Sequence, residues 1–222
     1  MTTEKTKKTR SKTRRSRRSK RNRFANNELS QLDFQERVMA EGLNPDNPLL
    51  ERVRFLAIVA SNLDEFFAVR VAQLKRQIEQ GSRGKSPDGR TPRQTLKEIY
   101  KQLPKMYSRM HRCMSRELLP AMRREGIRIV SPDKLTDEEN RYLDRYFTEE
   151  VYPVLTPLAI GPGHPFPILG PELTLFVETT SVDEGAIRPA DRAVLQLPGN
   201  LERFIELPGA TEGHRVLPME EV

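Results

Sequence analysis

The sequence contains a single cysteine, Cys113, which excludes a disulfide within the chain. No histidine or aspartate stands beside it in a recognisable catalytic pattern, so we interpret Cys113 as an ordinary thiol. A chain without disulfides is suited to a reducing cytoplasm. We therefore predict a cytoplasmic protein, and its basic tail, described below, leaves peripheral association with a membrane surface open.

Long apolar runs are also missing. No window of the sequence approaches the about 18 consecutive apolar residues that are typical of a membrane-spanning helix. The sequence therefore predicts no transmembrane segment.

Histidine is scarce, with only His111, His164 and His214 in the chain. None has a second histidine or a cysteine at metal-ligand spacing, so no metal site is predicted. His164 lies among prolines, which favours a structural role, and His214 is predicted to lie in a polar loop, exposed to solvent. Adjacent Asp64 and Glu65 would point about 100° apart on a helix and form no acid–base pair. The residues by themselves therefore indicate no reaction.

The basic charge of the chain is concentrated in residues 1–23. This segment holds 12 Lys or Arg and one acidic residue, Glu4, whereas the remainder holds 26 basic and 30 acidic residues. It has no apolar side chain after Met1, so we predict a disordered tail and neither a signal peptide nor a transit peptide. Two interpretations stay open: a polyanion-binding arm for nucleic acid, anionic lipid or polyphosphate, or a solubilising extension.

Helical signals dominate residues 24–125. The first predicted helix begins at a cap formed by Asn26 or Asn27 and ends at Gly42–Pro45. The second begins at Pro48, where a missing backbone N–H costs nothing, and runs to about Gln80.

A polar loop at 81–89 then leads to the third predicted helix. The loop is rich in glycine but lacks the spacing of a phosphate-binding loop, so we interpret it as a flexible connection. Thr91 and Gln94 form a capping box that opens the helix. Pro104 and Pro120 predict kinks in it.

From residue 126 the pattern changes to a mixture of strands and helix. Residues 126–130 alternate like a strand, and a capping box at Thr136 opens a helix that ends near residue 151. Prolines forbid a central strand in 152–167, which we expect to be a rigid extended connection. Further strands are predicted at 173–180, 193–197 and 215–217.

Together these signals predict an α+β fold in three parts. Residues 1–23 form the disordered basic tail, residues 24–125 a three-helix N-terminal domain, and residues 126–222 an α+β domain. The last part has few strands for a complete sheet, so we expect a truncated chain.

One amide stands out on the second predicted helix. At 100° per residue, Asn62 shares a face with apolar residues. An unpaired buried amide costs roughly 1–3 kcal/mol, so its donors and acceptor need partners. Two interpretations stay open: a structural hydrogen bond to a neighbouring group, or a contact to a polar ligand such as adenine, with which asparagine pairs bidentately. The apolar residues of this face are Phe55, Ile58, Val59, Phe66 and Val69.

Three blocks of the sequence resemble the bacterial polyphosphate kinases of the histidine-phosphorylating, four-domain type. They read FANNELSQLDFQERV at 24–38, PLLERVRFLAIVASNLDEFFAVRV at 48–71 and EEVYPVLTPLAIGPGHPFP at 149–167. The third block is similar to a motif of that family's head domain. Two positions depart from the family pattern: Gln31 stands where tryptophan is common, and Gly161 where aspartate is common.

The resemblance implies reversible transfer of the terminal phosphate of ATP to polyphosphate through a phosphohistidine, with ATP and Mg²⁺ as cofactors and a homo-oligomer formed through the head domain. The family's catalytic histidines and Mg²⁺ ligands lie in two C-terminal domains, so the resemblance implies no catalytic or metal-binding residue here and an inactive fragment. It implies one ATP-binding residue, because the Asn of SNLDEFF, Asn62 here, contacts the adenine. The alternative function is a non-enzymatic helical module that binds polyanions or nucleic acid with a basic arm.

Overall fold

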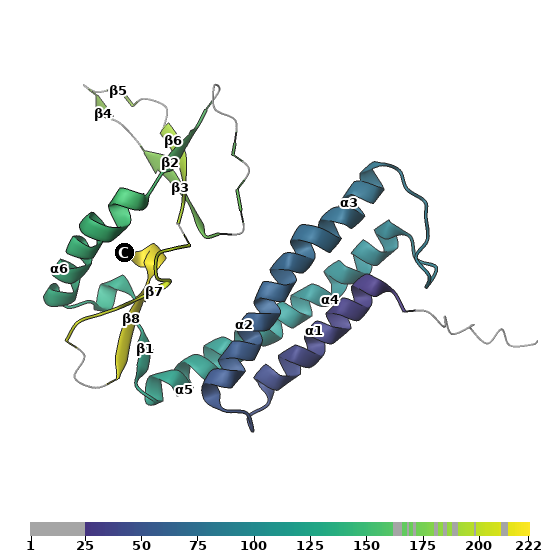
Figure 1. Cartoon of the computed structure of the whole chain (residues 1–222), viewed down its shortest axis with the longest axis horizontal. Helices are drawn as coiled ribbons and strands as arrows, with labels where there is room; N and C mark the ends of the chain where they lie inside the picture. Colours follow the sequence, from purple (N-terminus) through teal and green to yellow (C-terminus); the bar gives the residue numbers. More distant parts are fainter. Residues whose placement is uncertain are drawn as a thin grey trace, which may run out of the picture.

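Figure 1 shows the computed structural model of the chain, which has a helical half, residues 25–124, and a mixed half, residues 125–222. The basic tail that the sequence predicts to be disordered lies outside the described residues, and so does His164. The structure describes residues 25–161, 166–167, 169–170, 172–179, 182–183, 186–187, 191–197, 199–209 and 213–222.

The first helix, α1, spans Asn27–Leu43. Asn26 caps it as predicted, because its Oδ1 accepts a hydrogen bond of 3.1 Å from the backbone N–H of Leu29. Near its end, Gly42 lies against the next helix, where an added Cβ would come within 2.6 Å of Leu56 Cδ2. The missing side chain at Gly42 therefore permits the close approach of the two helices.

The second predicted helix is present but contains a π-helical turn that the sequence did not predict. It consists of α2 (Leu49–Phe66), the π-helical turn η1 (Phe67–Val71) and α3 (Ala72–Glu79). The π-helical turn directly follows the SNLDEF segment. Turns of this kind occur mostly as single insertions and frequently at functional sites.

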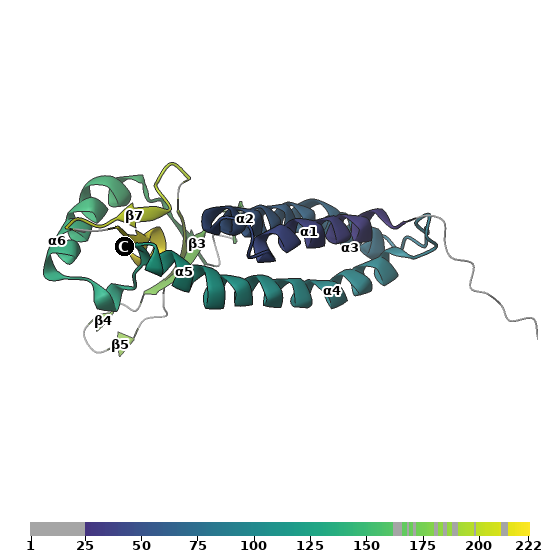
Figure 2. The ribbon, with the colours of Figure 1, turned by 90° about the horizontal axis from the view of Figure 1, so that it is seen from below.

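The third predicted helix consists of α4 (Pro92–Cys113), the π-helical turn η2 (Met114–Leu118) and α5 (Leu119–Arg124). The predicted capping box of Thr91 and Gln94 is confirmed, and α4 continues through Pro104. In Figure 2, α4 runs along one side of the helical half and α1, α2 and α3 along the other. The core between these layers contains Leu32, Met39, Leu56, Val59, Leu63, Phe66, Val71, Leu74, Ile99, Leu103, Met106, Met110, Cys113 and Leu118.

The loop before α4 differs from the flexible connection that the sequence predicted. Asp88 is only 7% exposed, and its Oδ1 accepts a hydrogen bond of 2.6 Å from Ser86 Oγ. Asn26 Nδ2 lies 3.1 Å from Ser86 Oγ and 3.2 Å from Thr95 Oγ1. Arg90 also forms a salt bridge with Asp88. The loop is therefore anchored to the starts of α1 and α4, which sequence spacing alone could not indicate.

In the mixed half, a first sheet has the strand order β1-β8-β7. Its strands are β1 (Ile127–Ile129), β8 (His214–Pro218) and β7 (Phe204–Glu206). β1 is parallel to β8, with Ile127 opposite His214, and β7 is antiparallel to β8. Helix α6 (Asp137–Tyr146) and the π-helical turn η4 (Phe147–Val151) follow β1 in the chain. A second core contains Leu143, Val151, Ile205, Leu207, Leu217 and Met219.

A second sheet has the order β2-β6-β3, with all neighbours antiparallel. Its edge strand β2, Pro157–Ile160, lies in the proline-rich segment that we expected to be only an extended connection. Pro157 stands at the first position of an edge strand, where a missing N–H is tolerated. The other strands are β3 (Thr174–Thr179) and β6 (Asp191–Gln196), and a separate ribbon pairs β4 (Val182–Asp183) with β5 (Ala186–Ile187).

The predicted α+β fold is confirmed, and the strands expected at 173–180, 193–197 and 215–217 correspond to β3, β6 and β8. The prediction for His214 is wrong about its secondary structure. His214 does not lie in a loop but opens β8, where its Nδ1 is 2.7 Å from Glu206 Oε1, although its side chain remains exposed. Among the described residues, no helix has both the length and the apolar character needed to cross a membrane.

Candidate functional site

A groove of about 430 Å³ lies between α1 and the long helix formed by α2 and η1. Each helix contributes five residues to its lining, at positions i, i+3, i+4, i+7 and i+8, which is the pattern of one helical face. The lining residues are Asn27, Ser30, Gln31, Phe34 and Gln35 of the first helix, and Asn62, Glu65, Phe66, Val69 and Arg70 of the second.

Asn62 is half-buried in this groove, and its Nδ2 donates a hydrogen bond of 3.1 Å to Gln35 Oε1. The sequence had placed it in the middle of a buried apolar face, which is wrong. Ile58 is 40% exposed and Val69 is 49% exposed. Asn62 is not fully buried because only one side of this helix packs into the core, while the side that carries Asn62 faces the groove. The buried side consists of Leu56, Val59, Leu63 and Phe66.

Amides are the main polar groups of the groove. Gln35 is 9% exposed and accepts the hydrogen bond from Asn62. One turn earlier on α1, the Oε1 atom of Gln31 is buried and accepts no hydrogen bond from any of the described residues. Because an unsatisfied buried acceptor is costly, this carbonyl can accept a donor brought by a ligand or a water molecule.

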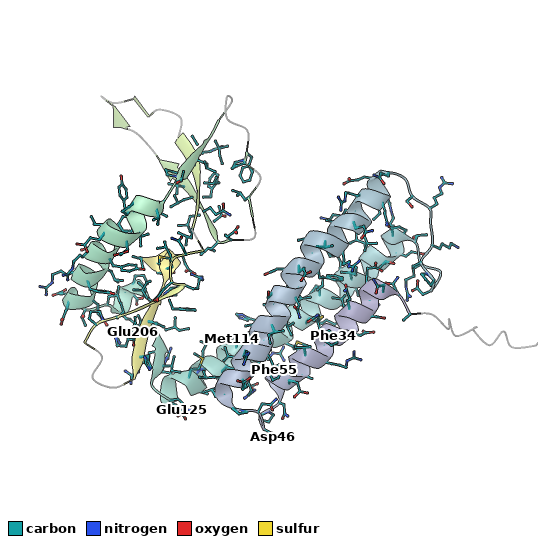
Figure 3. The ribbon with its side chains drawn as sticks, viewed as in Figure 1. Phe34, Asp46, Phe55, Met114, Glu125 and Glu206 are labelled. Atoms are coloured by element: carbon teal, nitrogen blue, oxygen red, sulfur yellow. The ribbon has the colours of Figure 1, made fainter. Side chains whose placement is uncertain are left out.

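The apolar part of the groove contains an exposed aromatic ring. Phe34 projects from α1, as Figure 3 labels it, and is 49% exposed. Such a ring can stack against a planar ligand. Only Glu65 and Arg70 carry charge among the lining residues, so the groove has no net charge. The arrangement suits an uncharged, planar group with hydrogen-bonding edges better than a phosphate chain.

The turn η1 contributes Val69 and Arg70 to the groove. In a π-helical turn one additional residue is inserted, so the residues after it are rotated relative to the helix before it. The Asn62 end of the groove therefore belongs to a regular helix, whereas its other end has irregular geometry.

No histidine or cysteine lines this groove among the described residues, and its one carboxylate is Glu65. His111 is exposed on α4, and His214 belongs to the mixed half. Cys113 is buried, and burial raises the pKa of its thiol, with the charge of Glu117 raising it further, so the structure supports an inert thiol. Within the described ranges, no group of three or more His, Cys, Asp or Glu side chains could hold a metal ion.

Sequence reasoning singled out Asn62 but missed Gln35, Phe34 and Arg70. A signal for the first two was present. α1 carries polar or exposed residues at the positions of the groove face, while Leu32 and Met39 are fully buried on another face. That pattern indicates an open polar face, but not which helix lies opposite it.

Comparison with known proteins gives a consistent result over both halves. Residues 24–130 match the polyphosphate kinase N-terminal domain, and residues 138–222 match the polyphosphate kinase middle domain. A polyphosphate kinase of Mycolicibacterium gilvum is 45% identical over 205 residues, which cover 90% of this chain and 28% of that protein. One from Mycobacterium tuberculosis is 45% identical over 213 residues, with the same shares of both chains.

The crystal structure of polyphosphate kinase from Porphyromonas gingivalis is similar to 89% of this chain, with a TM-score of 0.73 and 27% identity, over 29% of its own chain. This chain therefore spans about 28% of the length of the curated relatives it matches. It belongs to the polyphosphate kinase family, of which it carries the N-terminal and middle domains.

Proposed function

We propose that the groove binds the adenine base of ATP, as one wall of the nucleotide site of a polyphosphate kinase, and that Asn62 reads the base. The observation that carries this proposal is the pair of amides, Asn62 and Gln35, held 3.1 Å apart beside the exposed ring of Phe34. An asparagine side chain offers a donor and an acceptor in the geometry that adenine matches. An exposed aromatic ring supplies a stacking partner for the base.

The hydrogen bond to Gln35 leaves Asn62 suited to this role. It uses one of the two hydrogens on Nδ2 and restrains the amide. None of the described residues hydrogen-bonds the second hydrogen or the Oδ1 atom of Asn62, so both can serve a ligand. A restrained amide loses less conformational freedom on binding than a mobile one, which favours affinity.

The charge of the groove lining supports a further part of this proposal, the direction in which the phosphates of ATP point. Glu65 and Arg70 together carry no net charge, so the groove offers no excess of positive charge to a triphosphate. The phosphates of ATP would then point out of the groove. Residues that hold them and Mg²⁺ are needed elsewhere, since no cluster of metal-ligating side chains occurs among the described residues.

For the whole reaction we propose the activity of the family, the reversible transfer of the terminal phosphate of ATP to polyphosphate. A histidine nucleophile would divide the transfer into two steps. Neither His111 nor His214 lines the groove, and His164 lies outside the described residues. The proposed part of this chain in the reaction is therefore to hold the base, and not to carry the phosphate.

The purified 222-residue chain is accordingly expected to form no polyphosphate from ATP and Mg²⁺. Polyphosphate synthesis can be followed with radiolabelled ATP, and protein phosphorylation can be followed by acid-labile label. Turnover by the purified chain that is abolished in His164→Ala would contradict this expectation.

We also propose the division of the chain into a basic tail at 1–23, a helical domain at 24–125 and a second domain at 126–222. The two hydrophobic cores support this division because they share no residue. A homo-oligomer formed through the second domain and a cytoplasmic location, in keeping with the single cysteine, belong to the same proposal.

Asn62→Ala should weaken the binding of ATP to the purified chain about tenfold, because about 1.4 kcal/mol of hydrogen bonding to the base is lost. The unfolding free energy should fall by about 1 kcal/mol or less, since Asn62 is only half-buried. Isothermal titration with ATP and urea denaturation measure the two effects. Phe34→Ala should weaken ATP binding without loss of stability, since its ring is 49% exposed.

Ser61→Ala is the matched control, because Ser61 is exposed on the same helix and does not line the groove. It should leave both quantities unchanged. If Asn62→Ala lowered the melting temperature by several degrees while ATP affinity stayed the same, Asn62 would be a structural residue. Absence of ATP binding by the unsubstituted chain would equally count against the groove.

A further inference from the structure

The long helix α4, with the turn η2, carries a row of basic residues on its outer face. Residues 92–118 contain seven Lys or Arg and only two acidic residues. Lys97, Lys101 and Lys105 follow one another at intervals of four, which stacks them along one side of the helix. We call the exposed set the basic ridge, and it consists of Lys97, Lys101, Lys105, Arg112 and Arg116.

The ridge faces away from the rest of the helical half. α4 packs into the core through Ile99, Leu103 and Met106, which are at most 3% exposed. In Figure 2, α1, α2 and α3 lie together on one side of α4. At a rise of about 1.5 Å per residue, the ridge extends for about 28 Å, which is the shape of a site for a linear ligand.

Few acidic groups neutralise the ridge. Lys101 Nζ lies 3.3 Å from Glu98 Oε1, in a pair exposed to solvent. In the part of the chain that the structure describes, no carboxylate lies within 4 Å of the charged group of Lys97, Lys105, Arg112 or Arg116. Like charges at i and i+4 destabilise a helix by a few tenths of a kcal/mol per pair. A bound polyanion would remove this repulsion.

The first part of the ridge adjoins a hollow of about 790 Å³. Its lining combines the cations Arg90, Lys97 and Lys101 with the carboxylates Asp88 and Glu98. Arg90 is paired with Asp88 and Lys101 with Glu98. Lys97 therefore adds a positive charge to this hollow that no described carboxylate neutralises within 4 Å.

We propose that the basic ridge binds a linear polyphosphate chain, at a surface separate from the adenine groove. Polyphosphate as the ligand rests on the proposed function, because it is the substrate of that reaction. A row of lysine and arginine side chains matches a linear ligand that carries a negative charge on every phosphate unit and has no nucleobases. Of the aromatic residues that the structure describes, Tyr100 alone lines the hollow with Lys97 and Lys101. A single-stranded nucleic-acid site instead stacks successive bases on aromatic side chains along the groove.

Lysine footprinting on the full chain locates the ligand directly. With long-chain polyphosphate present, acetylation of Lys97, Lys101 and Lys105 should slow several-fold, measured by mass spectrometry. Lys75, exposed on α3, is the internal control and should react at an unchanged rate. Equal protection of Lys75, or no protection of the three ridge lysines, would overturn the proposal.

A triple variant, Lys97→Gln with Lys101→Gln and Lys105→Gln, tests the affinity. Polyphosphate binding should weaken about tenfold or more at low salt, and the slope of log affinity against log salt should fall by about two, as expected for three lost charge contacts. The matched control is Lys75→Gln with Arg76→Gln and Arg145→Gln, which removes three exposed basic residues elsewhere on helices. The tail is intact in both variants, so its own contribution cancels.

Two further binding measurements distinguish the ridge from the groove and polyphosphate from nucleic acid. ATP affinity should be equal in the triple variant and the unsubstituted chain, so a defect in the groove would not resemble a defect in the ridge. An oligonucleotide of equal charge should bind more weakly than polyphosphate. If it bound more tightly, or if the control variant lost as much affinity as the ridge variant, the ridge would not be a polyphosphate site.

Discussion

Glu139→Ala should lower the unfolding free energy of the mixed half by about 2–3 kcal/mol, because it removes a buried carboxylate that accepts several hydrogen bonds, while its partner Arg215 keeps 25% of its side chain exposed. Glu139 is 3% exposed, and its two carboxylate oxygens lie 2.8 and 3.1 Å from Nε and Nη2 of Arg215. It also accepts a hydrogen bond of 2.8 Å from the backbone N–H of Thr136. One side chain thus caps α6 and connects it to β8. Urea denaturation combined with hydrogen exchange in β8 measures the loss.

Two companion variants separate these contributions. Glu138→Ala removes an exposed acid from the same turn and should cost about 0.5 kcal/mol or less. Glu139→Gln keeps an oxygen for the Thr136 N–H but removes the charge that pairs with Arg215, so its cost should lie between the two. A cost of Glu139→Ala no larger than that of Glu138→Ala would show that the ion pair contributes no stability.

The same pair predicts a loss of stability in acid. The hydrogen bonds from Arg215 lower the pKa of Glu139, against the raising effect of its burial. A carboxyl with a lowered pKa stabilises the fold above its unfolded pKa, and this contribution is lost as the pH falls through the folded value.

Asp88→Ala should destabilise the helical half by about 3 kcal/mol, because it removes a buried carboxylate that accepts several hydrogen bonds. Asp88 Oδ1 accepts hydrogen bonds from Ser86 Oγ at 2.6 Å and from the Arg90 N–H at 3.2 Å. Asn26 Nδ2 lies 3.4 Å from the same oxygen. Loss of Asp88 should therefore increase hydrogen exchange at the starts of α1 and α4.

The pH dependence gives an independent test of Asp88. Burial raises its pKa, but the hydrogen bonds from Ser86, Arg90 and Asn26 outweigh burial and lower the pKa from 3.8 to about 2. Its contribution is complete above the unfolded pKa and should disappear between about pH 4 and pH 2. Asp46→Ala, in the exposed loop between α1 and α2, is the control. If both variants had the same stability and the same acid midpoint as the unsubstituted chain, Asp88 would not anchor the loop.

Much of the fold could be predicted from local signals. Caps at Asn26, Thr91 and Thr136 and the apolar periodicity indicated where the helices begin, because these signals act between residues close in the chain. The π-helical turns were not predicted, since no residue pattern in the sequence indicated them. The anchored loop was missed because Asp88 and Asn26 are 62 residues apart.

For the candidate site, too, the sequence could predict some residues and not others. Its most informative residue, Asn62, could be selected from the sequence as an amide on an apolar helix, and the resemblance added the adenine. Its partner Gln35 could not be selected, since the pairing depends on the way α1 packs against α2. The expectation that Asn62 is buried was wrong for the same reason, because a helical wheel does not show how far a face is covered.

The sequence by itself determined the helices, most strands, the position of the basic charge and the family resemblance, since each depends on residue type and spacing along the chain. Tertiary structure alone decided which faces meet. Because of this packing, the side of the second helix that carries Asn62 lines a groove, and the basic ridge of α4 stays exposed. Asp88 and Glu139 are buried beside partners that are distant in the chain. These outcomes depend on packing between segments far apart in the chain. The periodicity of residues within one segment carries no information about such packing.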